Sequence, residues 1–247
     1  MQPSTASLGV VLLLVGAPQA LGQYFDLPPL PPPDAYGDVV IDRTSSAKGV
    51  APVVFSHLVH RQKFTCRVCH SELDFATTVN TTEITEKATQ EGAYCGACHN
   101  GTVAFGHGQE NCRKCHVNAR DRKSATAPKT LPRTKFGNRV DWMAALASGA
   151  IKPASSLGGD YRPMTFDKTL SLEAEWDNIP PAVFPHDAHN AWLDCSSCHP
   201  GVFNIEKKTT KHFSMPRILK GEFCGACHLR VAFPLNDCRR CHPKMRE

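Results

Sequence analysis

The sequence has no long hydrophobic run. No uninterrupted apolar stretch in its 247 residues approaches the roughly 18–20 residues that a membrane-spanning helix needs, so an integral membrane protein is not expected. Aromatic residues make up only 8%, although the ordinary hydrophobic content of 41% argues against wholesale disorder. What the sequence has in excess is cysteine and histidine, with twelve of each. One kind of chemistry should account for all twelve cysteines, and the candidates are a disulfide framework, zinc, iron–sulfur clusters and haem.

The first residues predict export. Leu8–Val15 is a short apolar run followed by small residues, the pattern of a signal peptide over residues 1–22 that is cleaved after Gly22 or Ala20. No Lys or Arg precedes the run, so either the true start lies elsewhere or the amino-terminal charge suffices. The first cysteine is Cys66, so we expect no lipoprotein anchor at the cleavage site. The predicted location is the periplasm, the cell surface or the extracellular space.

Every cysteine belongs to the motif Cys-x-x-Cys-His, which occurs six times and attaches c-type haem. Two thiols about one helical turn apart can bond the two vinyl groups on one edge of a porphyrin, and the imidazole that follows becomes an axial ligand of the iron. Six motifs with no cysteine left over predict six covalently attached haem c groups. The motif residues are Cys66, Cys69 and His70; Cys95, Cys98 and His99; Cys112, Cys115 and His116; Cys195, Cys198 and His199; Cys224, Cys227 and His228; and Cys238, Cys241 and His242.

Zinc, iron–sulfur clusters and disulfides do not account for the histidines of the motifs. A tetrahedral zinc site does not require a His directly after every second Cys, and iron–sulfur ligation does not require it either. A disulfide framework would not place all twelve cysteines in such pairs.

The histidines outside the motifs match the haems in number. Six irons with one motif His each need six further ligands if all are coordinated by two imidazoles. Methionine is the competing ligand, but after Met1 only four methionines exist, too few for six irons. Bis-histidine ligation is therefore predicted, and the candidate ligands are His57, His60, His107, His186, His189 and His212.

The chain is a tandem duplication of a three-haem unit. A constant offset of 129 residues relates two non-motif histidines and the first two motifs of each half, whereas the third motifs differ by 126. The sequences agree as well, because Phe55–His60 matches Phe184–His189 and Tyr94–His99 matches Phe223–His228.

The repeat breaks at one candidate ligand. His212 in the second unit corresponds to Glu83, whereas His107 in the first unit corresponds to Leu235. Each unit thus keeps three non-motif histidines, one of which has changed position. We interpret this as two solutions for ligating the third haem of a unit.

Phe-x-His-x-x-His followed by three Cys-x-x-Cys-His motifs resembles the triheme cytochrome c7 family, a relative of the tetraheme cytochrome c3 carriers. The resemblance covers residues of about 51–116 and 181–243. It implies low-potential, bis-histidine electron carriers whose fold is mainly irregular, with short α-helices in two tandem triheme modules wrapped around packed haems. It also implies the pairs His57 with His70, His60 with His99, His186 with His199, His189 with His228, and His212 with His242. The pair His107 with His116 follows from the count alone.

The remaining segments are predicted to connect the units. Residues 23–50 are a Pro-rich linker, 51–120 the first triheme module, 121–180 a second linker and 181–247 the second module.

Within the second linker, Asn138 is expected to cap a short helix that runs through Ala147 and stops at Gly149. With Val140 and Met143 on one face, this helix is interpreted as a packing brace between the units.

The formal charge of +5 does not predict a nucleic-acid partner. Six ferric haems and twelve ionised propionates bring the charge to about −1, and full reduction to about −7. The basic residues are therefore assigned to the propionates. Those at the end of the first module and in the second linker are Arg120, Arg122, Lys123, Lys129, Arg133 and Lys135.

The expected function is that of an exported hexahaem electron carrier or wire without catalytic residues. Expected partners are other redox proteins: cytochromes, membrane quinol-linked complexes or outer-surface conduits. One alternative is the subunit of an extracellular cytochrome filament, in which copies of the chain polymerise. Another is a multihaem reductase, which needs an iron with an open site. No motif ends in Lys and no haem lacks a candidate His, which counts against a reductase.

Overall fold

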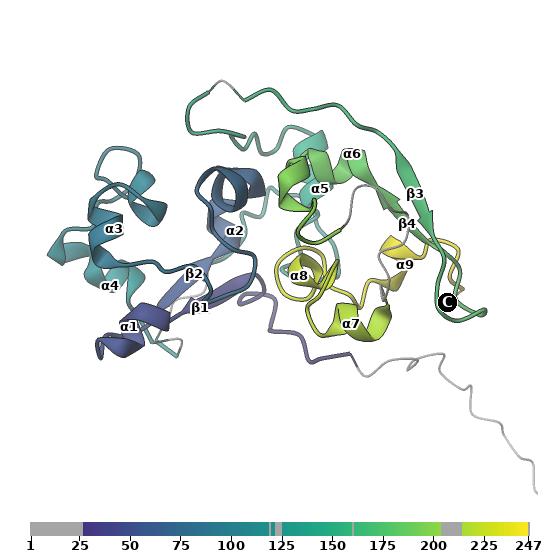
Figure 1. The fold of residues 1–247 in the computed structure, drawn as a ribbon, viewed down its shortest axis with the longest axis horizontal. Helices are drawn as coiled ribbons and strands as arrows, with labels where there is room; N and C mark the ends of the chain where they lie inside the picture. The colour runs from purple at the N-terminus through teal and green to yellow at the C-terminus, as the bar shows by residue number, and fades with distance from the viewer. Residues whose placement is uncertain (1–26, 119, 122–124, 160, 204–213, 247) are drawn as a thin grey trace, which may run out of the picture.

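The computed structural model describes residues 27–118, 120–121, 125–159, 161–203 and 214–246. The predicted signal peptide and His212 lie outside these ranges. Two units lie side by side along the long axis of the molecule, and the segment that joins them passes between and over them (Figure 1).

The first unit and the joining segment consist of short elements connected by irregular chain. The first unit contains β1 (Asp38–Ile41), α1 (Arg43–Ala47), β2 (Val53–Ser56), α2 (His57–His60), the π-helical turn η1 (Val68–Glu72), α3 (Glu86–Gln90), the 3-10 turns η2 (Tyr94–Ala97) and η3 (Gln109–Asn111), and α4 (Cys112–Cys115). The joining segment contains α5 (Trp142–Ala147).

The second unit repeats this order with small differences. It contains β3 (Thr169–Leu172), β4 (Ala182–Pro185), α6 (His186–Asn190), η4 (Cys195–Ser197), α7 (Met215–Leu219), α8 (Gly225–His228) and α9 (Cys238–Cys241). The fold is therefore mainly irregular with short helices, as predicted. Helices this short are not stable in isolation, so their stability depends on what they pack against.

Each unit begins with a two-stranded antiparallel hairpin. β1 pairs with β2 with Asp38 opposite Ser56, and β3 pairs with β4 with Thr169 opposite Pro185. The helix that carries His-x-x-His follows each hairpin directly. Since β1 and β3 come from the segments 23–50 and 121–180, both predicted linkers contribute a strand to a unit.

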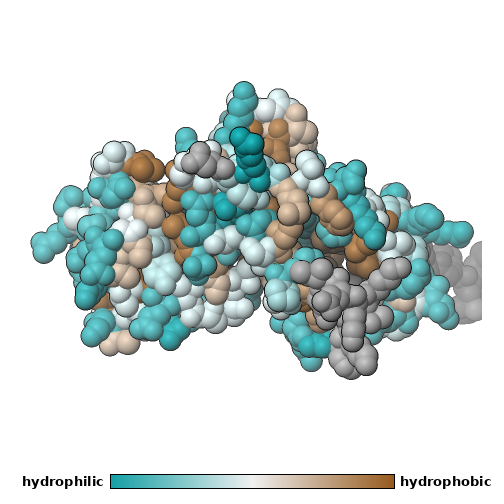
Figure 2. Space-filling view, turned by 45° about the horizontal axis from the view of Figure 1, so that its top comes forward, coloured by the Kyte–Doolittle hydropathy of each residue, from teal (hydrophilic) through white to brown (hydrophobic). Residues whose placement is uncertain are grey.

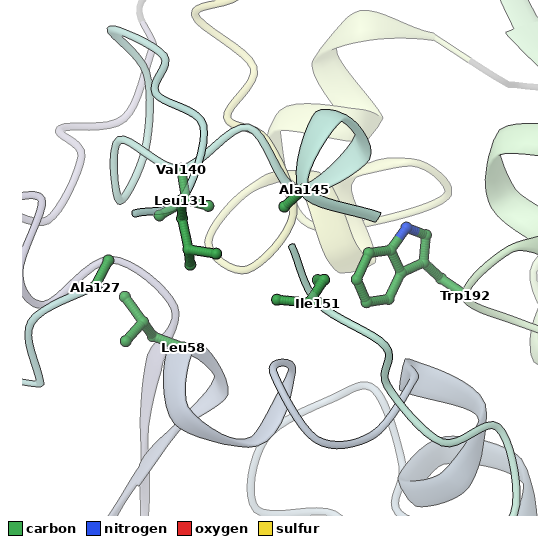
Figure 3. Packing of buried hydrophobic residues seen from close by; sticks show 7 residues of the cluster. All are labelled: Leu58, Ala127, Leu131, Val140, Ala145, Ile151 and Trp192. Atoms are coloured by element: carbon green, nitrogen blue, oxygen red, sulfur yellow. The ribbon is translucent and has the colours of Figure 1, made fainter. Parts of the chain in front are cut away.

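The main hydrophobic cluster lies where the two units meet (Figure 3). Leu58 of α2 and Trp192, which follows α6, contribute to it from the two sides. The joining segment provides the rest: Ala127, Leu131, Val140, Ala145 and Ile151. This segment is thus part of the core rather than a solvated tether.

The helix expected in the joining segment is present, but the predicted cap was wrong. Asp141 begins α5, because its backbone is extended and its side chain accepts a hydrogen bond from the Ala144 N–H at 3.0 Å. Asn138 lies in the preceding turn, where its side-chain oxygen accepts from the Trp142 indole at 3.2 Å. Gly149, at φ +71°, follows the helix end as expected.

Polar contacts also fix the units to each other. The Arg67 guanidinium forms an ion pair across the contact with the Asp194 carboxylate at 3.1 Å and donates a hydrogen bond within its own unit to the Glu72 carboxylate at 2.8 Å. From the amino-terminal side, the buried Tyr36 donates its hydroxyl to the Ala232 carbonyl at 2.8 Å. The two units are therefore held in one relative arrangement by contacts from the joining segment, from Arg67 in the first unit and from Tyr36 near the amino terminus.

Hydrophobic side chains emerge between hydrophilic ones in several separate patches of the surface (Figure 2). Among the large ones, Met164 is 68% exposed and Val103 61%. Within the ranges given above, no helix is long and apolar enough to cross a membrane.

Candidate haem-binding sites

The six cysteine motifs form tight turns. All twelve cysteines are free thiols. In five of the motifs the N–H of the His donates to the carbonyl of the first Cys at 2.8–2.9 Å, which closes one helical turn. The exception is the first motif, which runs into η1. Both thiols therefore lie about one turn apart, the spacing that attachment to one porphyrin edge requires.

Hydrogen bonds fix the orientation of the candidate ligands. In ten of the eleven histidines that the structure describes, Nδ1 lies 2.6–3.1 Å from a backbone carbonyl oxygen. A carbonyl can only accept, so Nδ1 carries the proton and the Nε2 lone pair is left for a metal. The ten are His57, His60, His70, His99, His116, His186, His189, His199, His228 and His242.

The anchors follow the repeat. The first His of Phe-x-His-x-x-His takes the carbonyl just before the first strand, Gly37 for His57 and Lys168 for His186. The hairpins thus position the ligands. Carbonyls that precede β2 and β4 serve the third motifs in the same way, Ala51 for His116 and Pro180 for His242.

Three pairs of histidine rings face each other across a gap that fits one metal ion. A metal binds an imidazole nitrogen at about 2 Å, so two rings on opposite sides of one ion have centroids about 6 Å apart. The observed ring centroids are 6.4 Å apart for His57 and His70, 6.2 Å for His60 and His99, and 6.1 Å for His189 and His228. The first pair is nearly parallel, at 5°, whereas the others are tilted by 58° and 66°.

The three remaining expected pairs are not shown as ring pairs. His212 lies outside the described residues. In the part of the chain that the structure describes, no such ring contact joins His186 to His199 or His107 to His116, and these pairings stay predictions. His107 is exposed and is the one described histidine whose Nδ1 bonds no carbonyl there.

One phenylalanine in each unit orients both histidines that follow it. Phe55 stacks on His60 at 4.3 Å between ring centroids and meets His57 edge-on at 4.9 Å. Phe184 does the same with His189 and His186, at 4.3 and 4.9 Å. Because these contacts recur at the same distances, the Phe of Phe-x-His-x-x-His is a ring-positioning residue in both units.

Burial keeps these rings neutral. It lowers the pKa of His57 to about 3 and that of His228 to about 4. The pKa values of His60, His70 and His189 are also lowered by burial. Iron binds neutral imidazole, so the environment favours the state that ligation needs.

Close backbone packing holds the second motif of each unit. A Cβ on Gly96 would lie 1.9 Å from the Thr89 carbonyl oxygen of α3, and one on Gly225 would lie 1.9 Å from that of Ile218 in α7. These two glycines were missed from the sequence, although both stand in the repeated Cys-Gly-Ala-Cys-His. Only glycine allows the helix to approach the motif so closely.

The thiols show which motifs are neighbours. Burial raises the pKa of Cys95 to about 11, with Cys115 adding to the shift, and that of Cys69 to about 12, with Cys98 contributing. Ring contacts agree that these motifs are neighbours: Phe75 after the first motif lies 5.4 Å from Tyr94 before the second, and Lys114 in the third lies 4.8 Å from Phe105 after the second.

Motifs of the two units are also neighbours at the contact between the units. Burial raises the pKa of Cys227 to about 11, with contributions from the Cys66 and Cys198 thiols. It raises that of Cys224 to about 12, with a contribution from Cys241. The fifth motif thus neighbours the first motif across the contact, as well as the fourth and sixth in its own unit.

Comparison with known proteins decides the family. The family described as cytochrome c7 and related cytochrome c matches residues 53–117 and 182–243, together more than half of the chain. The chain belongs to the cytochrome c7 family.

Three solved structures are similar to this cytochrome. The C-terminal hexaheme fragment of GSU1996 is 27% identical, with 87% of this chain and 99% of that chain covered and a TM-score of 0.29. The N-terminal hexaheme fragment is 25% identical, with 85% and 99% covered and a TM-score of 0.27. The dodecaheme cytochrome c GSU1996 is 24% identical, with 83% and 73% covered and a TM-score of 0.28. A comparison with curated proteins finds no match.

Membership of this family indicates the chemistry of the sites. This cytochrome is a multihaem c-type protein built from tandem triheme c7-type modules, and such proteins transfer electrons. The paired histidines and the cysteine turns described above are the residues that fit haem c.

Proposed function

We propose that this cytochrome carries six covalently bound haem c groups, each with two axial histidines, and acts as a low-potential multi-electron carrier or wire. Haem iron supplies a reversible one-electron Fe(III)/Fe(II) couple when bound. The protein contributes the ligands, their orientation and the spacing between sites.

The facing histidine rings carry this proposal. Their centroids are 6.1–6.4 Å apart, and each partner is fixed through Nδ1 with Nε2 left for the iron. Two neutral imidazoles, rather than a Met and a His, favour a low potential. The proposal extends to His186 with His199, His107 with His116, and His212 with His242.

The neighbouring motifs support a wire rather than six isolated sites. The contacts of Phe75 with Tyr94 and of Lys114 with Phe105 support a row of the first, second and third motifs. The Arg61–Val231 hydrogen bond supports a continuation of this row to the fifth motif in the other unit. An electron could therefore cross from one unit to the other without leaving the protein.

Export and partners complete the proposal. The amino-terminal pattern predicts delivery to the periplasm or beyond, where other cytochromes, quinol-linked complexes or surface conduits would exchange electrons with the chain. Basic residues inside the third motif of each unit, among them Lys114 and Arg240, favour acidic docking partners.

Mass spectrometry of the denatured protein, combined with optical and EPR spectra of the native protein, tests the proposal. We expect the mass of the chain plus six haems and a wholly low-spin oxidised spectrum. Fewer than six haems would contradict the cofactor count, and a large high-spin component would contradict bis-histidine ligation. Fractionation of the producing cells tests export, which predicts the haem-loaded chain outside the cytoplasm.

A further inference from the structure

Arg61 lies where the two units meet. It follows His60 at the end of α2, and its guanidinium donates a hydrogen bond from Nη2 to the Val231 carbonyl at 3.1 Å. Its Cζ lies 5.0 Å from the ring centroid of Trp142 and 5.9 Å from that of Trp192. Figure 1 shows α2 and α8 near each other at this contact. The cation is thus held between a helix of one unit, the joining segment and the second unit.

This arrangement breaks the internal repeat. The position equivalent to Arg61 in the second unit is Asn190, and the position equivalent to Trp192 in the first unit is Lys63. Both partners of the cation–π contact therefore exist only where the units face each other. The duplicated copies have diverged to build this one environment.

No carboxylate balances the charge. Among the described residues no Asp or Glu forms an ion pair with Arg61, whereas Arg67, Arg217 and Arg240 each have at least one such partner. Burial lowers the pKa of Arg61, so its cation is poorly solvated. The Arg61 residue is partly buried, so its charge acts more strongly on neighbouring groups than it would in water.

The groups around it belong to two haem motifs. Val231, whose carbonyl accepts from Arg61, donates its own N–H to the Cys227 carbonyl of the fifth motif at 3.1 Å. Trp192, which Arg61 also contacts, accepts through its carbonyl from the N–H of Arg67, inside the first motif, at 2.9 Å. A positive charge in a low-dielectric environment disfavours the more positive of two charge states nearby. Reduction removes one positive charge from a haem, so this charge favours the reduced form at both motifs.

We propose that Arg61 raises the reduction potentials of the two haems that flank the contact, at Cys66/Cys69 and at Cys224/Cys227. This inference rests on the function proposed above. Electrons that enter either unit then collect where the units meet. Passage across the contact oxidises one Fe(II) to Fe(III) and reduces one Fe(III) to Fe(II), so it consumes no other reactant. In this role Arg61 is a potential-setting residue.

The order of reduction in the unmodified holo-protein is the first test. NMR of partly reduced samples, with signals assigned to individual haems, should show that the haems at Cys66 and Cys227 are the first two to be reduced. Any other haem reduced ahead of both would overturn the proposal. The result needs no variant and therefore does not depend on the folding of one.

Charge variants are the second test. Arg61→Gln should lower the reduction potentials of these two haems by at least about 59 mV, which for one electron is a tenfold change in the oxidised-to-reduced ratio. The potentials of the other four haems should not change. Arg61→Lys should retain most of the wild-type potential because it keeps the charge. Lys63→Gln, two residues away and exposed, is the matched control and should change none.

The outcomes separate the two proposals. Unchanged potentials in Arg61→Gln, or equal losses in the Gln and Lys variants, would overturn the role of the Arg61 charge even if six low-spin haems are present. A haem count below six would overturn the proposed function instead.

Discussion

Gly96 and Gly225, the glycines of the two Cys-Gly-Ala-Cys-His motifs, are positions at which one added methyl group should be poorly tolerated. At Gly96 the new Cβ would lie 1.9 Å from the carbonyl oxygen of Thr89 and 2.8 Å from its carbonyl carbon. The atoms in the way belong to the backbone of α3, so no rotamer change can relieve the clash. The helix has to move away from the motif by more than 1 Å to reach ordinary contact.

The expected loss follows from this geometry. Overpacking costs about 1–3 kcal/mol in general, and a backbone obstacle favours the upper end, about 3 kcal/mol. For a chain of this length 1 kcal/mol changes the midpoint of thermal unfolding by about 2–4 °C, so Gly96→Ala should lower it by about 6–12 °C. Gly225→Ala should do the same, and the two effects should add because the sites lie in separate units.

Thermal unfolding of the holo-proteins, followed by far-UV circular dichroism, measures these values. Gly158→Ala is the control, because the nearest atom to its Cβ would be Ser156 Oγ at 3.9 Å. This control should remain within about 2 °C of the wild type. If Gly96→Ala unfolds at the same temperature as Gly158→Ala, the motif and α3 are not packed as described.

Three further predictions concern ligation and pH. His107→Ala should convert one haem of six to a high-spin form that binds carbon monoxide, whereas Glu83→Ala should not; a wholly low-spin His107 variant would show that this haem takes its ligand elsewhere. The free energy of unfolding should fall as the pH drops from about 6.5 towards 4. The folded-state pKa values of His57 and His228 are about 3 and 4, so these two rings take up protons only on unfolding. Each of them should lower the free energy of unfolding by about 1.4 kcal/mol per pH unit. Denaturant unfolding at pH 7.5 and 5.0 measures this, and equal stability at both would contradict it. The mean reduction potential should fall as the pH rises from about 5.5 to 8.5, because each added electron raises the pKa of nearby propionates; six potentials independent of pH would refute the coupling.

The family was predictable because its signals are local. Cys-x-x-Cys-His is a contiguous motif whose spacing follows from one helical turn, and the duplication is visible as a constant offset. Three ring pairs that the family resemblance implied, such as His57 with His70, lie together in the structure. The irregular fold was predictable too, since the haems that the motifs predict leave little need for a continuous protein core.

The contact between the units could not be predicted, because it depends on residues far apart in the sequence. Trp192 and Arg61 belong to no sequence motif, and their contact depends on the path that the joining segment takes. The helix cap was misplaced by three residues because Asn138 and Asp141 are both good capping residues, and only the backbone conformation distinguishes them.

The carbonyl anchors of the histidines have a consequence for how such a protein changes over evolutionary time. Every residue type carries a backbone carbonyl, so no substitution removes the hydrogen-bond acceptor itself. The two units already illustrate this, because Gly37 and Lys168 hold equivalent histidines and so do Ala51 and Pro180. Side chains at these positions are free to drift while the imidazoles keep their orientation. Loss of a ligand's alignment requires a change in the path of the backbone, so we expect shifts in loop length to be selected against more strongly here than amino-acid replacements.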